Sequence, residues 1–266
     1  MILSDVHCHL DHPAISSRID DVIANAKNAS VKAMITNGIN PETNNISLNL
    51  SKKYENVYSA LGIYPIDALQ NEAKDVEGGY PVTKNSFDWN EHINWIKDKI
   101  KTNRNVLAIG EVGLDYNFPE PDKDLQKKIF QRFIELSEKT KKPLIIHSRK
   151  AESDVVEMLL SSKLKNPVMH CFSGKKKLAA TIRDNGWNFS IPSNVVRSQQ
   201  FQRIVDETPL SQIFTETDAP YLSPFKDQIN EPAFIVENVK KIAEIKKMTA
   251  EEVSNQIYWN FQRLFL

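Results

Sequence analysis

The sequence predicts an α/β fold, specifically a (β/α)8 TIM barrel, and three observations favour it. Eight short apolar segments of strand length recur along the 266 residues. Amphipathic segments of helical period separate most of them, and no flexible linker or low-complexity tract divides the chain. Strand and helix alternating eight times in this length are typical of a closed barrel of parallel strands. We therefore expect one domain over residues 1–266, with an open doubly wound sheet as the alternative.

The predicted strands are short apolar runs, and each is followed by polar or helix-forming sequence. In chain order they are MILSDVH (1–7), VKAMITNG (31–38), VYSALGI (57–63), NVLAIGEV (105–112), PLIIH (143–147), PVMHCF (167–172), GWNFSI (186–191) and SQIFTETD (211–218).

Capping residues and apolar stripes mark the clearest helices. Residues 88–101 begin at Asp88 with Glu91 three positions later, which is the pattern of a capping box. Segments that follow Asp122 and Thr249 carry apolar residues at every third or fourth position. This period is typical of helices with one buried face.

Composition narrows the class of protein. Lys plus Arg and Asp plus Glu both number 34, so the formal net charge is zero and contact with nucleic acid requires a local basic patch. Only Cys8 and Cys171 are present, which argues against a disulfide framework and suits a reducing compartment. No secretory signal and no apolar run near the ~20 residues that span a bilayer is visible. We expect a cytoplasmic protein without membrane contact.

Unusual polar residues gather at the predicted strand ends, where barrel enzymes place their active sites. They are His7 and His9 on the first strand, Glu111 on the fourth, His147 on the fifth, His170 on the sixth and Asp218 on the eighth. Residues two apart on a strand face the same side, so His7 and His9 both point into the barrel mouth. By the same parity Asp5 and Glu216 lie one layer below, where they could hold ligand imidazoles or a water molecule.

This set of side chains predicts a metal site at the C-terminal ends of the strands. Four imidazoles and two carboxylates buried without partners would cost several kcal/mol each. Six such ligands can hold two divalent ions if one carboxylate bridges them. Glu111, from the middle of this circle of ligands, is the best candidate for the bridge. Two carboxylates offset only half the charge of two divalent ions, so the site attracts an anion such as a phosphate ester.

Five motifs run in order along nearly the whole chain, and they are DVHCHLD, GEVGLDY, PLIIHSR, HCFSG and TETDAPYL. Together they resemble the TatD family of metal-dependent deoxyribonucleases, within the amidohydrolase superfamily. The resemblance implies two ligand sets, one of His7, His9, Glu111 and Asp218 and the other of Glu111, His147 and His170. It further implies a monomer that cleaves DNA, including 3′-to-5′ trimming, with Mg²⁺ or a transition metal.

The chain departs from the family pattern after the third strand. Many members have two histidines where this chain has Tyr64 and Ile66. Tyr64 can still donate a hydrogen bond to a substrate, whereas Ile66 cannot. The polar stretch 67–87 that follows looks longer than the family usually allows, so a lid or a partner surface is expected there.

Hydrolysis of a phosphodiester assigns roles to further residues. Asp218 is predicted to accept or direct the proton of the attacking water beside the bridging Glu111. Arg149 is predicted to grip a phosphate oxygen with its planar guanidinium, the alternative being a surface ion pair. Ser173 and Lys175 open a predicted helix whose N-terminus binds another phosphate, the alternative being a solvated run of charges.

Several questions stay open at this stage. Four imidazoles suit Zn²⁺ or Mn²⁺ better than Mg²⁺, so the expected cofactor is two divalent ions drawn from these three. The alternative functions are hydrolysis of another ester or amide, such as an aminoacyl-tRNA, and a catalytically idle binding scaffold. His12 and His92 lie away from strand ends and are predicted to be structural. Asp115 and Tyr116 either are structural or border the cleft.

Overall fold

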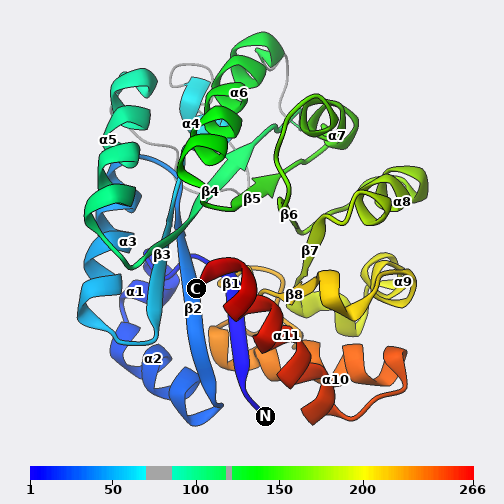
Figure 1. Ribbon diagram of the computed structural model, residues 1–266. Coiled ribbons are helices and arrows are strands. Elements are labelled where there is room, and N and C mark those ends of the chain that lie inside the picture. The colour runs from blue at the N-terminus through cyan, green and yellow to red at the C-terminus, as the bar shows by residue number, and fades with distance from the viewer. Residues whose placement is uncertain (70–85, 118–121) are drawn as a thin grey trace.

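The structure, a computed structural model, describes residues 1–69, 86–117 and 122–266. Eight parallel strands pair in chain order, each with the next in sequence, and helices surround them (Figure 1). The strands are β1 (Leu3–Cys8), β2 (Val31–Gly38), β3 (Val57–Leu61), β4 (Val106–Gly113), β5 (Leu144–His147), β6 (Val168–His170), β7 (Asn188–Ile191) and β8 (Ile213–Thr215). The predicted TIM barrel is confirmed.

The barrel closes through the segments that carry predicted ligands. The Asp218 amide donates to the His7 carbonyl at 2.9 Å, and the His9 amide donates to the Ala219 carbonyl at 2.8 Å. These bonds join the end of β1 to the chain just past β8. The two stretches are far apart in sequence, so closure itself brings their side chains to one place.

The three helices with predicted caps begin where the sequence indicates, after Asp88, Asp122 and Thr249, and others surround the barrel with them. The described helices are α1 (Pro13–Ser16), α2 (Ile19–Asn28), α3 (Pro41–Lys53), α4 (Pro65–Leu69), α5 (Trp89–Thr102), α6 (Lys123–Thr140), α7 (Glu152–Leu160), α8 (Lys176–Asp184), α9 (Gln199–Glu207), α10 (Ile235–Lys246) and α11 (Ala250–Phe265). Single 3₁₀ turns are η1 (Ser193–Val196), η2 (Leu210–Gln212) and η3 (Pro232–Phe234). The Asp88 side chain accepts from the Glu91 amide, and Thr249 and Glu252 form a full capping box. No described helix has the length and apolar character needed to cross a membrane.

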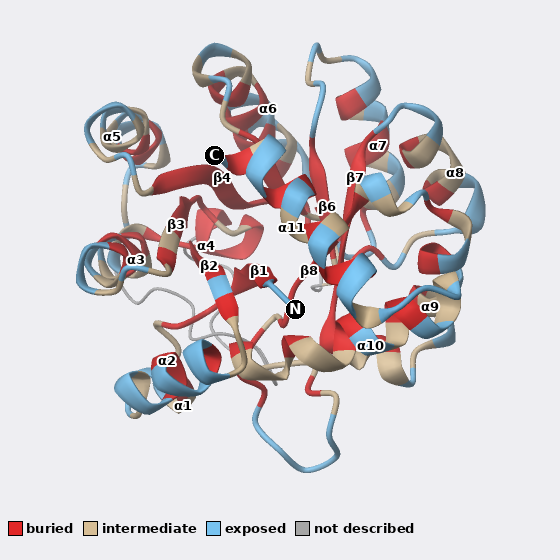
Figure 2. Ribbon diagram, turned by 60° about the horizontal axis from the view of Figure 1, so that its bottom comes forward, coloured by how far each residue is buried: buried red, intermediate tan, exposed pale blue. Residues whose placement is uncertain are grey.

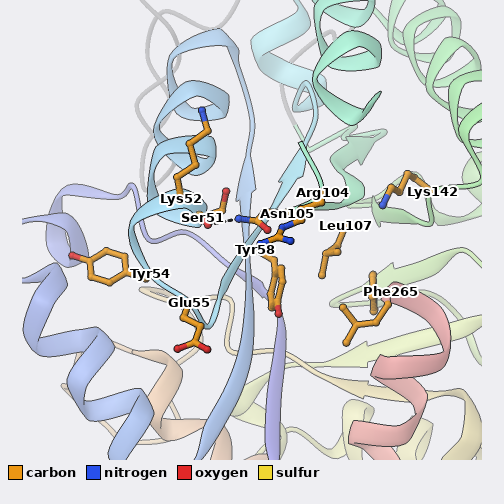
Figure 3. Close-up of a pocket in the computed structure, with 11 residues that line it drawn as sticks. Ser51, Lys52, Tyr54, Glu55, Tyr58, Arg104, Asn105, Leu107, Lys142 and Phe265 are labelled. Carbon is orange, nitrogen blue, oxygen red and sulfur yellow. Dashed lines mark hydrogen bonds between the residues drawn. The ribbon is translucent and has the colours of Figure 1, made fainter. Parts of the chain in front are cut away.

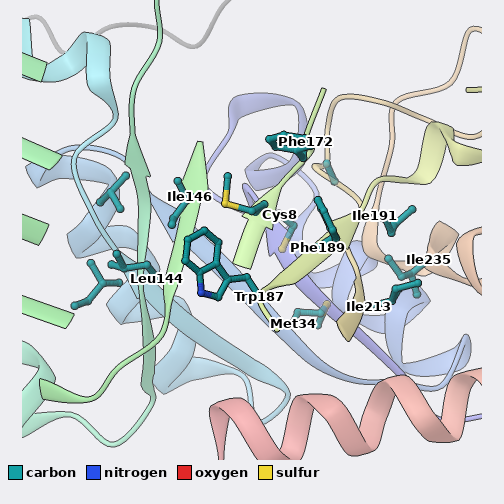
Figure 4. Close-up of a cluster of buried hydrophobic side chains, with 14 of the residues drawn as sticks. Cys8, Met34, Leu144, Ile146, Phe172, Trp187, Phe189, Ile191, Ile213 and Ile235 are labelled. Carbon is teal, nitrogen blue, oxygen red and sulfur yellow. The ribbon is translucent and has the colours of Figure 1, made fainter. Parts of the chain in front are cut away.

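Apolar packing fills both the barrel and the layer outside it. Figure 2 shows the strands buried and the outer faces of the helices exposed. Side chains such as Cys8, Trp187 and Phe189 pack in the cluster drawn in Figure 4. A second cluster joins Ile145 and Val168, on strands that carry predicted ligands, and Phe214 of β8 to Phe261 and Phe265 of α11. Ile145 and Val168 lie two residues before His147 and His170, so this cluster supports the ligands from below.

A cavity of ≈ 540 Å³ opens at the end of the barrel where the strands begin (Figure 3). Its lining includes Tyr58 and Leu107 near the starts of β3 and β4, Arg104 from the turn before β4, and Phe265 at the end of α11. Because all strands run in one direction, this is the N-terminal end of the barrel. It therefore lies away from the predicted ligands. Most of the stretch 67–87 falls outside the described residues, although Asp67–Leu69 form the end of α4.

Candidate metal centre

The structure brings the six predicted ligands to one end of the barrel. They are His7 in β1, His9 one residue past β1, Glu111 in β4, His147 and His170 as the last residues of β5 and β6, and Asp218 three residues past β8. The predicted eighth strand runs to Asp218, whereas β8 ends at Thr215. Asp218 has a left-handed backbone (φ 55°), a conformation that a strand cannot contain and that is concentrated at functional sites.

Glu111 stands at the centre of the ligand ring, and its two oxygens face different histidines. Oε2 lies 3.5 Å from His7 Nε2 and 3.7 Å from His9 Nε2. Oε1 lies 2.8 Å from His147 Nδ1 and 3.8 Å from His170 Nε2. Asp218 Oδ1 is 3.5 Å from His7 Nε2, so it joins the first pair. We call His7, His9 and Asp218 the first half of the ring, and His147 and His170 the second half.

The ring nitrogens that face away from Glu111 are held by different groups. His170 Nδ1 lies 2.8 Å from a Glu216 oxygen, and His147 Nε2 lies 2.9 Å from Asp115 Oδ2. His9 Nδ1 instead lies 3.2 Å from the main-chain oxygen of Asn37. Outer partners of this kind fix the orientation of a ligand imidazole and raise its basicity. Glu216 thus contacts an imidazole in the manner that strand parity predicts.

The described hydrogen bonds of Asp5 are with main-chain amides and a hydroxyl. Its carboxylate accepts from the main-chain amides of His7 (3.2 Å) and Thr217 (2.9 Å), and from the Thr217 hydroxyl, rather than from an imidazole. The reason is that the chain beyond β8 passes close to β1 as the barrel closes. Burial raises the pKa of Asp5 to about 8. Asp5 therefore ties together the two backbone segments that carry the first half.

Charge and burial set the protonation of the metal-free ring. Burial holds the pKa of His7 well below its usual range, and the stacked ring of His170, 3.7 Å away between centroids, lowers it further. Burial alone would also lower the pKa of His147 and His170. Hydrogen bonds and charges from Asp115 and Glu111 outweigh it at His147 and raise its pKa to about 9. Glu216 does the same at His170, whose pKa rises to about 10.

The donor set fits divalent metal ions. Glu111 is shared by two groups whose ligand atoms lie within 4.8 Å of one another, one with His7 and His9 and the other with His147 and His170. The buried His7 Nδ1 has no hydrogen-bond partner among the described residues. Imidazole and carboxylate ligands together suit Zn²⁺, Mn²⁺ and related ions.

The predicted substrate contacts have mixed surroundings. Arg149 and Lys175 are exposed, in the loop after β5 and at the N-cap of α8. Ser173 is exposed and donates to Glu152 Oε1 at 3.1 Å. Tyr64 is turned inward, and its hydroxyl donates to Asp115 Oδ2 at 2.7 Å. Cys8, predicted to point away from the mouth, is buried in the apolar core.

Sequence reasoning left the role of Asp115 undecided, although a glycine nearby carried a signal. Gly113 has a φ of 144°, and a Cβ there would stand 2.0 Å from the His147 carbonyl oxygen. Only glycine permits this close approach of β4 to β5. The approach brings Asp115, two residues further on, against the His147 ring.

The fold and the ring define a metal-dependent hydrolase built on a barrel, and comparison with known proteins gives the family. The model of the TatD related DNase family matches residues 4–266, and the chain belongs to that family. It is an enzyme of the metal-dependent hydrolase class that acts on ester bonds.

Two relatives and one solved structure illustrate the match. The uncharacterized metal-dependent hydrolase YabD of Bacillus subtilis (strain 168) is 30% identical over 99% of this chain and 99% of its own length. Human deoxyribonuclease TATDN3 is 32% identical over 99% of this chain and 94% of its own. The crystal structure of YJJV, a TatD homolog from Escherichia coli K12, superposes with a TM-score of 0.86 at 24% identity, covering 99% and 97% of the two chains. The last likeness concerns the fold.

Proposed function

We propose that this enzyme is a deoxyribonuclease that hydrolyses DNA phosphodiester bonds at a dinuclear metal centre. The observation that carries the proposal is the position of Glu111, whose two oxygens face two separate pairs of imidazoles. A carboxylate placed in this way can bridge two ions, and paired ions suit an in-line displacement at phosphorus. The deoxyribonuclease name of the human relative supports DNA as the substrate.

The two carboxylates of the ligand ring have different roles in the proposed hydrolysis. Bound ions would polarise the phosphodiester and make a water molecule more acidic. Asp218 is the better of the two ring carboxylates to take a proton from that water, because its side chain is 14% exposed against 5% for Glu111. Glu111 holds both halves in register. All six ligands come from one chain, which supports a monomer as the working unit.

Exposed cations support the local basic patch that a chain of zero net charge needs to bind DNA. The loops after the last four strands carry exposed cations that include Arg149, Lys175, Arg197 and Lys226. None of the four forms an ion pair within the described part of the chain. The DNA backbone therefore runs over the side formed by β5 to β8.

Incubation with labelled DNA tests the proposal. Single- and double-stranded substrates, labelled at the 3′ or the 5′ end, are treated with the purified protein and Mn²⁺, Mg²⁺ or a chelator. Loss of the 3′ label first, only with metal, is the result expected of a 3′-to-5′ exonuclease. An Asp218→Asn variant should lose cleavage while it keeps most of its metal. If DNA survives with every metal, the proposal fails, and hydrolysis of another ester or amide, such as an aminoacyl-tRNA, becomes the better candidate.

A further inference from the structure

Tyr64 and Asp115 lie outside the ligand ring, yet they contact it at one point. The Tyr64 hydroxyl donates to Asp115 Oδ2 at 2.7 Å, and the same oxygen lies 2.9 Å from His147 Nε2. The Tyr64 ring meets the His147 ring edge-on, with centroids 4.9 Å apart and planes at 69°. Three groups from three segments, after β3, after β4 and at the end of β5, thus meet at the outer edge of one ligand.

Asp115 is held more firmly than a surface carboxylate would be. It is fully buried, and its second oxygen accepts from the Asn117 amide at 2.8 Å. Gln126 of α6 clamps its main chain from both sides, accepting from the Asp115 amide at 2.8 Å and donating to its carbonyl at 2.9 Å. Because hydrogen bonds hold both the main chain and the carboxylate of Asp115, the position of Oδ2 is fixed. An imidazole beside it must then present an N–H there.

We propose that Tyr64 and Asp115 are positioning residues that select which nitrogen of His147 binds metal. Asp115 accepts from Nε2–H, so Nδ1, which lies 2.8 Å from Glu111 Oε1, is the nitrogen left to bind an ion. Tyr64 fixes Oδ2 by donating to it and covers the ring edge-on. The inference rests on the proposed metal centre and reassigns Tyr64 from substrate contact to ligand alignment.

The consequence is confined to the second half of the ring. The described contacts of His7 and His9 are with one another and with Glu111, Asp218, His170 and the Asn37 carbonyl, among others, whereas those of Tyr64 and Asp115 are with His147. Loss of the alignment should therefore weaken one of two bound ions and spare the other. Replacing an outer partner of a ligand histidine typically costs about 10- to 100-fold in metal affinity.

Metal titration of the purified protein tests this without DNA. Zn²⁺ is titrated against a chromophoric chelator for wild type, Asp115→Asn, Tyr64→Phe and the control Tyr116→Phe. Tyr116 is a suitable control because its hydroxyl donates to Asp154 at 2.9 Å and not to Asp115. We expect one of two equivalents to weaken about 10- to 100-fold in Asp115→Asn and about 3- to 10-fold in Tyr64→Phe. The control should match wild type. Unchanged affinity in Asp115→Asn, or equal weakening of both equivalents, would overturn the proposal.

Nitrogen-15 NMR of the histidine rings gives a readout that a merely structural role would not move. In the Zn²⁺-loaded wild type the His147 signals, assigned with a His147→Gln variant, should report a proton on Nε2. Asp115→Asn should lose or mix that tautomer, and Tyr116→Phe should keep it. A proton on Nδ1 in the wild type refutes the proposal. Neither measurement involves DNA, so a failure to cleave DNA would count against the proposed function and not against this alignment.

Discussion

The two halves of the ligand ring hold their imidazoles by different means. In the first half the support comes from main chain. His9 Nδ1 faces the Asn37 carbonyl, and the amides of His9 and Asp218 close the barrel around it. In the second half the support comes from buried carboxylates, Asp115 at His147 and Glu216 at His170.

Strand length explains the difference. β1 is six residues long, and main-chain hydrogen bonds and the Asp5 carboxylate tie it to the chain past β8. β5 and β6 have only four and three residues, and their ligands are their last residues. A ring at the end of a short strand needs side-chain partners to hold its orientation. His9 should therefore tolerate loss of the Asn37 side chain, because its partner is the Asn37 main chain, whereas His147 and His170 should not tolerate loss of their carboxylate partners.

The largest effect on metal affinity and on DNA hydrolysis is expected from substitution of Glu111, which faces both halves of the ring. Glu111→Gln removes the negative charge that both pairs of imidazoles face, so both metal equivalents should weaken. DNA hydrolysis should fall by about 1000-fold or more, since metal ions contribute several kcal/mol to such reactions. Metal titration and a cleavage assay measure the two effects. If only one equivalent weakens, Glu111 serves one half and does not bridge.

A pair of substitutions compares the two kinds of support directly. Glu216→Gln removes the carboxylate behind His170, and one metal equivalent should lose about 10- to 100-fold in affinity. Asn37→Ala keeps the main-chain carbonyl that faces His9, so both equivalents should stay within about 3-fold of wild type, since the outer partner of that ligand is retained. Thermal unfolding of each variant checks that the barrel is intact. Equal losses in the two variants would remove the distinction between the halves.

Metal uptake should release protons, and His147 and His170 of the second half are two of their sources. Without metal, His147 and His170 have pKa values of about 9 and about 10, so both are protonated at neutral pH. An ion needs the unprotonated nitrogen, so affinity should rise with pH until the pH approaches 10. Calorimetric titration of Zn²⁺ at pH 7.5 in buffers of different ionisation enthalpy measures the protons released. A heat that does not depend on the buffer would mean that the rings are already neutral.

The sequence was sufficient for the barrel and for the convergence of the ligands, because both follow from periodicity. Each strand is a distinct apolar run, and parity places His7 with His9 and Glu216 beneath Asp218. The surroundings of Asp5 and Tyr64 could not be read in this way. Asp5 bonds to Thr217 because the ends of the barrel meet, and Tyr64 reaches Asp115 because Gly113 lets two strands approach closely. Such contacts depend on three-dimensional distances that no local pattern encodes.

The smallest effect concerns His92, which lies outside the ring and serves as a reference for its histidines. It is 8% exposed, its Nε2 lies 2.8 Å from the Asn44 amide nitrogen, and Trp95 stacks on it at 5.0 Å. Burial lowers its pKa to about 4, whereas the unfolded chain titrates near 6.5. The unfolded state therefore binds more protons between these values, so this stability is present above pH 6.5 and is lost as pH falls toward 4.

For His92 the loss between pH 7.5 and 5.5 should be about 1 kcal/mol in the free energy of unfolding. Urea unfolding of wild type and His92→Gln at the two pH values measures it, because glutamine cannot titrate and every other group is common to both proteins. The stability of wild type should fall more than that of the variant by this amount. Parallel changes would mean that His92 is protonated equally in both states. In that case burial without a carboxylate partner would not be enough to keep a histidine of this barrel neutral, and the contrast with His147 and His170 would lose its reference.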